Sequence, residues 1–535
     1  MAIITLNKKE VKKILGNLSD EKLEQEISMF GVPVENIKEE EIEVEIAPNR
    51  PDMLSCQGVY RALNSYFKNK ISKYKANKPE KNYAVKIDKS VKEIRPFTAC
   101  AIVKKLSFND EKIKEIIDIQ EKLHTTIGRN RKKVAIGIYP LEKIKLPISY
   151  KAEAPDKIKF IPLEMSREMT GRQILSQHPT GRDYAHLLEG AKKFPVFRDA
   201  TNNVLSMPPI INSQMTGKIT EQTKEVFIEC SGFNFNVLQK TLNILVTTLA
   251  DMGGEIYQMS LDYGKKIIIP DFTPEKMKIS IKDAEKLLGI KLEEKQVKKL
   301  LSKMGYSYSK ESVEIPAYRA DILHPVDIYE DIAIAYGYNK FIPEIPEIST
   351  IGREEEIEIK KRKIAEILCG LGLLEISTYH LTTKEDIKKT SLKTKEIEVL
   401  NSKTDFNILR PNLLVNALKT LSENTDAKYP QKIFELGRVF EDGKEISEKE
   451  KLCITISGET DFTEIKQILD YLMRMLTLEY KIEETTNSAF IDGRCGKILV
   501  GGKEIGFLGE ISPQLIKNWG LKMAAVSLEM EIEKI

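Results

Sequence analysis

Residues 319–339 read RADILHPVDIYEDIAIAYGYN, and residues 44–66, VEIAPNRPDMLSCQGVYRALNSY, follow the same pattern earlier in the chain. Each stretch contains Arg-x-Asp and then a closing helix, and each is preceded by a short strand and two helical patterns. Internal repeats are the first signal to read because they establish architecture. The sequence therefore predicts two related small α/β modules, over about residues 3–65 and 279–342.

Acidic side chains are concentrated in the second stretch. The four residues are Asp321, Asp327, Glu330 and Asp331. The last three are spaced i, i+3 and i+4, so they share one face of a helix that starts at Pro325 with His324 at its N-cap. Mg²⁺ favours carboxylate oxygens and keeps several waters, so these side chains form a candidate cation site. On charge alone, an acidic first turn that complements the helix dipole is the commoner arrangement.

The first copy separates these acidic residues into two groups. Asp321 has an acidic counterpart, Asp52. The residues opposite the other three are not acidic: Gly58, Arg61 and Ala62. The shared scaffold therefore does not need the last three acids. Asp321 either contributes to the cation site or has a structural role, pairing with Arg319 or ordering the turn.

Length and composition limit the class of protein. The chain has 535 residues, of which 41% are hydrophobic and 30% charged, which suits three or four globular domains. Its 83 basic and 80 acidic residues argue against a general polyanion binder, although local basic patches such as residues 129–133 remain. Six dispersed cysteines without a CxxC pair indicate reduced thiols. No stretch is apolar over the length of a membrane helix, and the N-terminus does not resemble a secretion signal, so we expect a cytoplasmic protein.

Periodicity and turn signals divide the chain into four segments. They are a small α/β module over 1–85, a mixed α/β domain over 86–270, the second small module over 271–345 and an α+β domain over 350–535. The mixed domain is predicted to contain a helix over 110–124, strands over 133–139 and 225–230, two strands within 193–211 that lead into a diproline loop, and a long helix over 234–252. The last domain is predicted to have a helix over 353–369, a strand signal within 370–382, and strands over 432–440, 451–457, 495–500 and 504–510 that form an antiparallel sheet.

Seven stretches, in order and at sensible spacing, resemble the β subunit of phenylalanyl-tRNA synthetase in its archaeal and eukaryotic form. They are EIAPNRPDMLSCQGVYRAL (45–63), IQEKLHTTIGRNRKKVAIGIYPLEKI (119–144), VLSMPPIINS (204–213), VFIECSGFNF (226–235), YRADILHPVDIYEDIAIAYGYN (318–339), KIFELGRVF (432–440) and FIDGRCGKI (490–498).

The resemblance implies a multidomain α+β fold. It comprises two winged-helix-like modules, a central editing-type α/β domain between them, and a C-terminal class II synthetase-like antiparallel sheet domain without catalytic motifs. Residues 350–535 contain no Gly-x-Gly-x-Gly followed by Arg, and the isolated Arg410 is more typical of a packing role. The implied partners are a catalytic α subunit in an α2β2 assembly and phenylalanine tRNA, with ATP and phenylalanine bound through the α subunit. The implied function is support of the ATP-dependent attachment of phenylalanine to its tRNA.

The resemblance also implies site residues. In this family the acidic cluster binds Mg²⁺, which carries over to Asp321, Asp327, Glu330 and Asp331. The central domain is similar to a domain that hydrolyses tyrosine attached in error to phenylalanine tRNA. Ester hydrolysis needs a held water, donors for the oxyanion and polar groups that recognise the phenol. The candidates are Asn212 and Ser213 at the end of the diproline loop, and Glu229 and Ser231 on the next strand, with Glu229 holding the tyrosine hydroxyl or orienting water.

Structural alternatives remain open for several of these residues. Ser231 or Asn234 could simply cap the following helix, and Ser213 could close a turn. His178 and His186 are possible general bases, although isolated histidines are more often surface or packing residues. No Ser-His-Asp arrangement can be assembled from the spacing.

Two other functions also remain open. One is a stand-alone tRNA deacylase, which would not need the C-terminal domain. The other is a non-enzymatic nucleic-acid-binding scaffold built on the two small modules, which the near-neutral charge disfavours.

Overall fold

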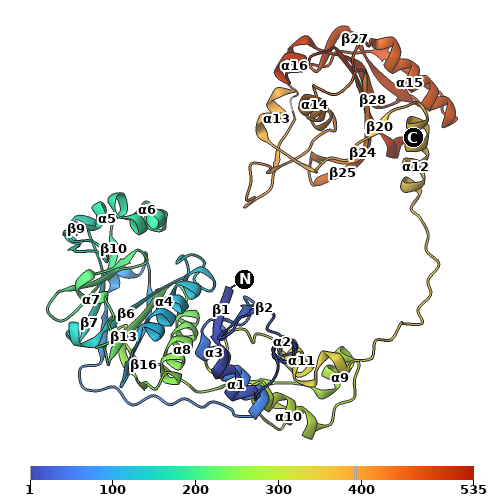
Figure 1. Cartoon of the computed structure of the whole chain (residues 1–535). Coiled ribbons are helices and arrows are strands. Elements are labelled where there is room, and N and C mark those ends of the chain that lie inside the picture. Colours follow the sequence, from blue (N-terminus) through green and yellow to red (C-terminus); the bar gives the residue numbers. More distant parts are fainter. Residues whose placement is uncertain (1, 391, 393) are drawn as a thin grey trace. The chain divides into compact units, whose positions relative to one another are not determined.

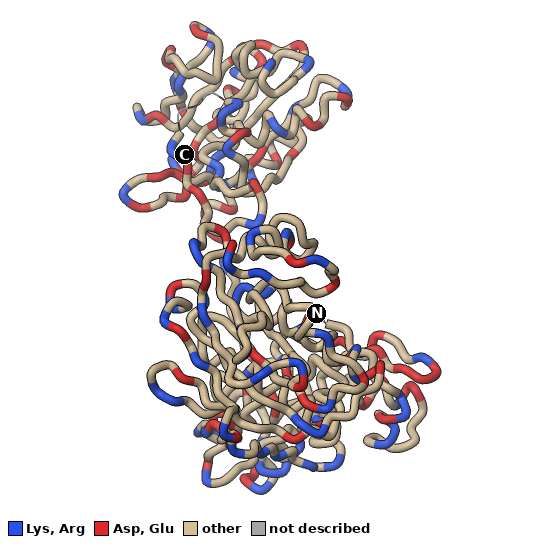
Figure 2. Tube along the Cα trace, turned by 90° about the vertical axis from the view of Figure 1, so that its left-hand side faces the viewer, with Lys and Arg blue, Asp and Glu red and all other residues tan. Residues whose placement is uncertain are grey.

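The computed structural model describes residues 2–390, 392 and 394–535, and contacts divide it into two compact units (Figure 1). The first unit ends at Glu344 and the second begins at Ile345. The first three segments expected from the sequence fall almost entirely within the first unit. Basic and acidic residues are interspersed along the traces of both units (Figure 2). None of the helices described is both long and apolar enough to cross a membrane.

Two small modules with the same topology begin and end the first unit. Their antiparallel sheets have the orders β1-β3-β2 and β17-β19-β18. The first module contains β1 (Ala2–Asn7), α1 (Lys8–Leu15), α2 (Asp20–Met29), β2 (Val34–Ile37), β3 (Glu41–Ile46), η1 (Pro51–Met53) and α3 (Cys56–Lys68). The second contains β17 (Glu275–Lys278), α9 (Ile281–Leu288), α10 (Glu294–Lys303), β18 (Ser307–Ser309), β19 (Ser312–Ile315) and α11 (Pro325–Tyr336).

These modules confirm the internal repeat and correct two of its details. Each copy has an additional short strand after its second helix, β2 or β18. The first strand of the second copy lies at Glu275–Lys278, before the expected position, because Ser280 caps α9 by accepting from the Asp283 backbone N–H. Asn7 caps α1 at the corresponding place in the first copy.

The two modules pack against each other through matching parts of their folds. After its second helix each has a glycine with positive φ, +94° at Gly31 and +86° at Gly305. A Cβ at Gly31 would meet Ile334 of α11, and a Cβ at Gly305 would meet Ser65 of α3, which is the position that corresponds to Ile334 in the repeat. The Tyr66 hydroxyl donates to the Ile334 carbonyl at 3.2 Å. The contact is therefore self-complementary, like the interface of a symmetric dimer.

Two sheets form the central region between the modules. A four-stranded antiparallel sheet has the order β14-β5-β13-β6, and a seven-stranded mixed sheet has the order β12-β11-β10-β7-β4-β15-β16, with β4 parallel to both of its neighbours. The strands of the first are β5 (Phe97–Lys104), β6 (Val134–Pro140), β13 (Val226–Gly232) and β14 (Glu255–Tyr257). Those of the second are β4 (Ala84–Ile87), β7 (Ile148–Glu153), β10 (Phe194–Arg198), β11 (Val204–Met207), β12 (Ile211–Asn212), β15 (Met259–Asp262) and β16 (Lys266–Ile269).

Helices and short elements complete the central region. They are α4 (Asp110–Thr125), α5 (Gly171–Gln177), α6 (Pro179–Tyr184), α7 (Gln214–Gly217), α8 (Phe235–Asp251), β8 (Lys159–Phe160), β9 (Met169–Thr170) and the 3-10 turns η2 (Lys89–Val91), η3 (Leu141–Lys143), η4 (Pro155–Lys157) and η5 (Ala185–Leu188). Asn234 caps α8 by accepting from the Val237 N–H, as one of the structural alternatives expected. The predicted boundary at residues 85 and 86 cuts through β4, because this strand pairs within the central sheet.

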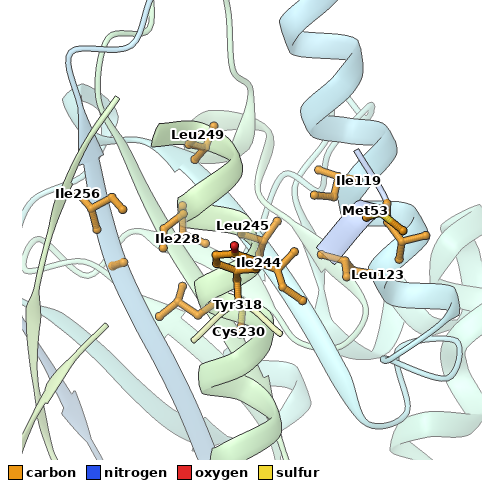
Figure 3. Packing of buried hydrophobic residues seen from close by; sticks show 14 of the residues in the cluster. Met53, Ile119, Leu123, Ile228, Cys230, Ile244, Leu245, Leu249, Ile256 and Tyr318 are labelled. Carbon is orange, nitrogen blue, oxygen red and sulfur yellow. The ribbon is translucent and has the colours of Figure 1, made fainter. Parts of the chain in front are cut away.

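The core of the first unit continues from the first module into the central region (Figure 3). Leu245 and Leu249 of α8 pack on the four-stranded sheet, where Ile228 and Ile256 lie. On the other side Leu123 of α4 lies close to the η1 turn of the first module in the same view. The sheet and α4, which form the cavity described below, are thus held by one continuous apolar core.

The second unit is built on a seven-stranded sheet of order β20-β24-β25-β29-β28-β27-β26, antiparallel except for the β20·β24 pair. Its strands are β20 (Leu374–Glu375), β24 (Gln431–Asp442), β25 (Ile446–Ser457), β26 (Tyr480–Glu484), β27 (Phe490–Val500), β28 (Lys503–Ile511) and β29 (Ala525–Glu531). A small sheet contains β21 (Leu381–Thr382), β22 (Ile397–Glu398) and β23 (Ile408–Leu409). The helices are α12 (Glu356–Gly370), α13 (Lys384–Lys389), α14 (Leu414–Glu423), α15 (Phe462–Met475) and α16 (Pro513–Asn518).

Side chains of the large sheet alternate between two apolar layers. Phe434 packs with α12 and α15, whereas Ile433 packs with α14. The predicted antiparallel sheet and the helix near 353–369 are therefore present. The strand signal over 370–382 resolves into two two-residue strands, β20 and β21, that belong to different sheets.

Candidate functional site

One guanidinium holds two of the four acidic residues of the second module. Arg319 donates to both oxygens of Asp321, at 2.9 and 2.7 Å, and to Asp331 at 2.8 Å. Tyr306 also donates to Asp331, and its ring lies 5.1 Å from the Arg319 guanidinium carbon. The structural pairing of Asp321 with Arg319, one of the two alternatives for this residue, is therefore confirmed.

The first module repeats this pair. Arg50 donates to Asp52 at 2.9 and 3.0 Å, and both side chains are largely buried. Burial raises the pKa of Asp52, but Arg50 and the nearby Arg319 outweigh it and hold the pKa at about 2. The Arg-x-Asp turn is therefore an ion pair that both copies use as part of their scaffold.

The other two acidic residues have different surroundings. Asp327 accepts from the backbone N–H groups of Leu323 and His324, both at 2.8 Å, which with the His324 side chain forms a capping box at the start of α11. This confirms His324 as the N-cap. Glu330 is exposed and has no hydrogen bond or ion pair within the described chain.

In this arrangement the four carboxylates do not fit one divalent cation. Throughout the described residues, no group of three or more His, Cys, Asp or Glu side chains is placed to hold a metal ion. Arg319 already supplies the positive charge for Asp321 and Asp331, and an Asp327 oxygen is used by the helix start. The magnesium site remains a prediction, and it requires Arg319 to release Asp331.

The central region contains a cavity of about 660 Å³ between α4, the diproline loop and strands β6 and β13. Isoleucines of α4 and the prolines of the loop supply its apolar surface. The polar and charged side chains that line it are Gln120, Glu121, His124, Arg131, Glu164, His178, Thr180, Ser206, Asn212, Gln214, Lys218 and Glu229. A pocket of this volume that combines apolar walls with convergent polar groups is typical of a small-molecule or substrate site.

Glu229 is the carboxylate at this cavity that is deepest in the protein, with 1% of its surface exposed. Its Oε1 accepts from the hydroxyl of Tyr139 at 3.2 Å and from Ser206 at 3.5 Å, while Oε2 is buried without a partner among the described atoms. Burial raises the pKa of Glu229 to about 8, although Arg95 and the hydrogen bonds lower it. The carboxyl is therefore largely neutral at pH 7, with one oxygen unused.

Of the four residues predicted for editing, the structure brings two to the cavity. Asn212 and Glu229 line it, and the Asn212 side-chain oxygen accepts from Tyr139 at 3.3 Å. Ser213 is buried at the start of α7 and does not line the cavity. Ser231 is bound instead to Arg95, whose Nε donates to the Ser231 hydroxyl at 3.1 Å. The structure therefore places Ser213 and Ser231 outside the cavity lining.

Of the histidines that line the cavity, His124 has both ring nitrogens engaged, whereas His178 keeps one ring nitrogen without a described partner. His124 lines the cavity, but its Nε2 accepts from the Ile136 N–H at 2.8 Å and its Nδ1 faces Glu121 at 3.2 Å. Burial lowers the pKa of His124, which keeps the ring neutral. His178 donates from Nε2 to the Leu163 carbonyl at 3.1 Å, so its buried Nδ1 carries a lone pair without a described partner. His186 is exposed, and its Nδ1 bonds to the Asp183 carbonyl.

Sequence reasoning missed Arg131, His124 and Tyr139. Arg131 donates to Glu121 of α4 and to the Ile210 carbonyl of the diproline loop, both at 2.9 Å, and so ties two walls of the cavity together. It follows Arg129 and Asn130 in a run of three residues with positive φ, a conformation that costs about 1–2 kcal/mol per non-glycine residue. The basic run 129–133 was visible in the sequence, but nothing there indicated that it faces the loop.

Arg410 of the second unit has the packing role expected from the sequence. It is 1% exposed and donates to Glu435 at 2.7 Å, to the Thr378 hydroxyl at 2.9 Å and to the Arg438 carbonyl at 2.7 Å. A guanidinium with these partners is not available to bind phosphates.

Comparisons with known proteins give the chain its family. It is 40% identical over 504 residues to the phenylalanine–tRNA ligase β subunit of Pyrococcus furiosus, a match covering 91% of this chain and 90% of the relative. It is 35% identical to the β subunit of Methanosarcina barkeri over 100% of this chain and 99% of the relative. The chain belongs to the archaeal-type phenylalanyl-tRNA synthetase β-subunit family.

Domain models and a solved structure agree with this assignment. The B3/4 domain model matches residues 80–248, the tRNA synthetase B5 domain model matches 277–338, and the phenylalanyl-tRNA synthetase β-chain CLM domain model matches 342–532. A crystallised N-terminal fragment of the β subunit from Pyrococcus horikoshii, 36% identical, superposes with a TM-score of 0.59 and covers 62% of this chain and 99% of the fragment. The cavity therefore lies in the B3/4 domain, which is associated with editing, and the acidic residues lie in the B5 domain.

Proposed function

We propose that this chain works with a catalytic α subunit in an α2β2 phenylalanine–tRNA ligase. The α subunit performs the ATP-dependent attachment of phenylalanine in the presence of Mg²⁺, and this chain supplies scaffold, tRNA contacts and proofreading in the cytoplasm. The support is the match of 90% or more of the chain to β subunits and the occupation of Arg410 by Glu435. Binding of Mg²⁺ by Asp321, Asp327, Glu330 and Asp331 remains a separate prediction.

The B3/4 cavity, in this proposal, hydrolyses tyrosine attached in error to phenylalanine tRNA. The observation that carries the proposal is the unpartnered Oε2 of Glu229, buried at a cavity with apolar walls. A tyrosine ring fills the apolar part, and its hydroxyl forms a hydrogen bond with Oε2. A phenylalanine ring would leave this oxygen unpaired. Sites built to bind a hydroxyl reject the analogue without it by roughly 10⁴–10⁵.

The neutral state of Glu229 suits this role. Its raised pKa keeps the carboxyl mostly protonated near pH 7, so tyrosine enters without sealing a full negative charge away from water. Because Oε1 accepts from Tyr139 and Ser206, the proton of the neutral carboxyl lies on Oε2, which donates to the oxygen of the tyrosine hydroxyl; the ionised carboxyl accepts the proton of that hydroxyl instead.

The ester bond itself is attacked by water in this proposal. Both nitrogens of His124 are occupied, and the described cavity lining holds no Ser-His-Asp arrangement that would form a covalent intermediate. Asn212 and Ser206 offer an amide and a hydroxyl to orient the water or the oxyanion.

The decisive experiment uses the chain co-expressed with its α subunit. Charging of phenylalanine tRNA is measured for each subunit alone and for the complex, and release of tyrosine is measured from tRNA charged with tyrosine. We expect charging by the complex only, and hydrolysis that Glu229→Gln slows at least tenfold. Hydrolysis by a chain that does not bind α would favour a stand-alone deacylase. Neither charging nor hydrolysis in the complex would overturn the proposal.

A further inference from the structure

The Tyr139 hydroxyl reaches Glu229 because the residue between them, Gly137, has no side chain. Its side chain lies on the same strand face as Gly137, and Gly137 pairs directly with Glu229 across β6 and β13. A Cβ at Gly137 would lie 2.1 Å from the Tyr139 hydroxyl oxygen and 2.7 Å from Glu229 Oε1. The absence of a side chain at Gly137 therefore creates the slot through which the phenol of Tyr139 reaches the carboxyl.

The ring of Tyr139 is fixed in this slot. It stacks on Phe227, its partner across the two strands, with centroids 5.8 Å apart and an angle of 28° between the planes. The side chain is fully buried, and its hydroxyl has acceptors at 3.2 Å on Glu229 and 3.3 Å on Asn212. Burial, together with the nearby Glu229, raises the pKa of Tyr139, so the phenol remains a donor.

The two oxygens of Glu229 therefore have different surroundings. Oε1 is already occupied by the protein's own phenol, with Ser206 beside it, and Oε2 has no partner among the described atoms. Because both oxygens belong to one rigid group, fixing Oε1 also fixes the direction of Oε2. A second phenol brought by a substrate can then use only Oε2.

We propose that Tyr139 is a positioning residue for substrate selection: its phenol holds Glu229 Oε1, so that Oε2 is oriented to form a hydrogen bond with the hydroxyl of a tyrosyl ester. This inference rests on the proposed editing function. Tyr139 sets discrimination between tyrosyl and phenylalanyl esters, and it does not take part in the hydrolysis itself. Without it, Glu229 can turn and bond to Ser206 or Asn212.

Tyr139→Phe removes the hydroxyl and keeps the stacked ring. The matched control is Tyr150→Phe, since Tyr150 is also fully buried, stacks on Phe197 at 4.3 Å, and donates its hydroxyl to the Arg95 carbonyl away from the cavity lining. Both variants are assayed in the complex with the α subunit, using tRNA charged with tyrosine or with phenylalanine. We expect Tyr139→Phe to lower the tyrosine-to-phenylalanine ratio of kcat/KM at least tenfold, mainly through KM for the tyrosyl substrate, and Tyr150→Phe to leave the ratio within twofold.

A pH profile separates positioning from general loss of structure. The Tyr139 hydroxyl favours the ionised form of Glu229, so its removal should move the Glu229-dependent limb of tyrosyl hydrolysis to higher pH. If the wild-type complex hydrolyses the tyrosyl ester and Tyr139→Phe leaves both the kcat/KM ratio and the pH profile unchanged, this inference alone is overturned. Wild-type complex without tyrosyl hydrolysis would instead overturn the proposed function. An equal loss in both tyrosine variants would show a structural role and would also reject the inference.

Discussion

Arg319 lies 2.8 Å from Asp331 and uses the same nitrogen to bind Asp321 at 2.7 Å. Arg319 and Asp331 are twelve positions apart in the sequence, and α11 begins between them. A cluster that looks like a cation site in the sequence is thus already neutralised in part by a guanidinium of the same chain. The next two predictions follow from this relationship.

Asp321→Asn should lower the free energy of unfolding of the first unit by about 3 kcal/mol, because it leaves Arg319 buried with one partner fewer. Asp52→Asn in the first module is the matched variant and should cost a similar amount. Circular dichroism during denaturation measures both, while the fluorescence of Trp519, the only tryptophan, reports the second unit and should not change. A loss of unfolding free energy below about 0.5 kcal/mol would mean that the Asp321–Arg319 pair contributes no more than an exposed ion pair.

Mn²⁺ should bind weakly to the chain alone, since Arg319 competes with the metal for two of the four carboxylates. Electron paramagnetic resonance titration measures free Mn²⁺ directly. Asp327→Ala and Glu330→Ala should each weaken this binding further, because Arg319 pairs with neither carboxylate. Tight binding that Asp327→Ala abolishes would instead establish the four-ligand site predicted from the sequence.

Glu229 should make the stability of the first unit depend on pH between about 4.5 and 8. Burial raises its pKa from 4.5 to about 8, so the folded state binds the proton more tightly than the unfolded state. The stabilisation that the raised pKa provides is complete below pH 4.5. It falls by up to ~1.4 kcal/mol per pH unit as pH rises, and it does not change further above pH 8. Glu229→Gln should show a smaller loss of melting temperature between pH 5.5 and 8.5 than the wild type. Glu164→Gln, an exposed residue at the same cavity, is the control and should behave like the wild type.

Gly137→Ala should disrupt the carboxyl site, because the added methyl would overlap the Tyr139 hydroxyl at 2.1 Å. Overpacking of this kind costs about 1–3 kcal/mol, and tyrosyl-tRNA hydrolysis should fall more than tenfold. Gly370→Ala, where no atom lies within 4 Å, is the matched control and should be neutral. Normal hydrolysis by Gly137→Ala would mean that Tyr139 and Glu229 can separate without consequence.

Arg410→Met should destabilise the second unit by about 3–5 kcal/mol, because Glu435 is then buried without its guanidinium. The double variant Arg410→Met with Glu435→Met should recover much of that loss. Trp519 fluorescence during denaturation provides the measurement. Loss of charging activity in a stable Arg410 variant complex would contradict the packing role and indicate contact with a ligand.

The sequence was most informative where local pattern decides structure. The repeat predicted both modules, and the match of Asp52 with Asp321 separated a scaffold ion pair from the remaining acids. Helix caps at His324 and Asn234 were also visible, because capping depends on neighbouring residues.

The sequence was least informative where partners come from distant strands. Ser231 is close to Glu229 in sequence, but Arg95 binds it from another part of the fold. Ser213 follows Asn212 but lies beyond the end of β12, where it is buried at the start of α7 and its backbone N–H donates to the Leu205 carbonyl. Tyr139 could be found only from the pairing of Gly137 with Glu229, which a single sequence does not contain.

The self-complementary contact of the two modules has a consequence for how the chain can be divided. In sequence order the B3/4 domain separates the modules. In the fold the two modules pack against each other, and the B3/4 domain is joined to both of them. A fragment cut to the B3/4 boundaries would lose both modules, and a fragment with a single module would expose the surface through which the two modules pack. The smallest autonomous piece that carries the cavity should therefore be the whole first unit, ending at Glu344.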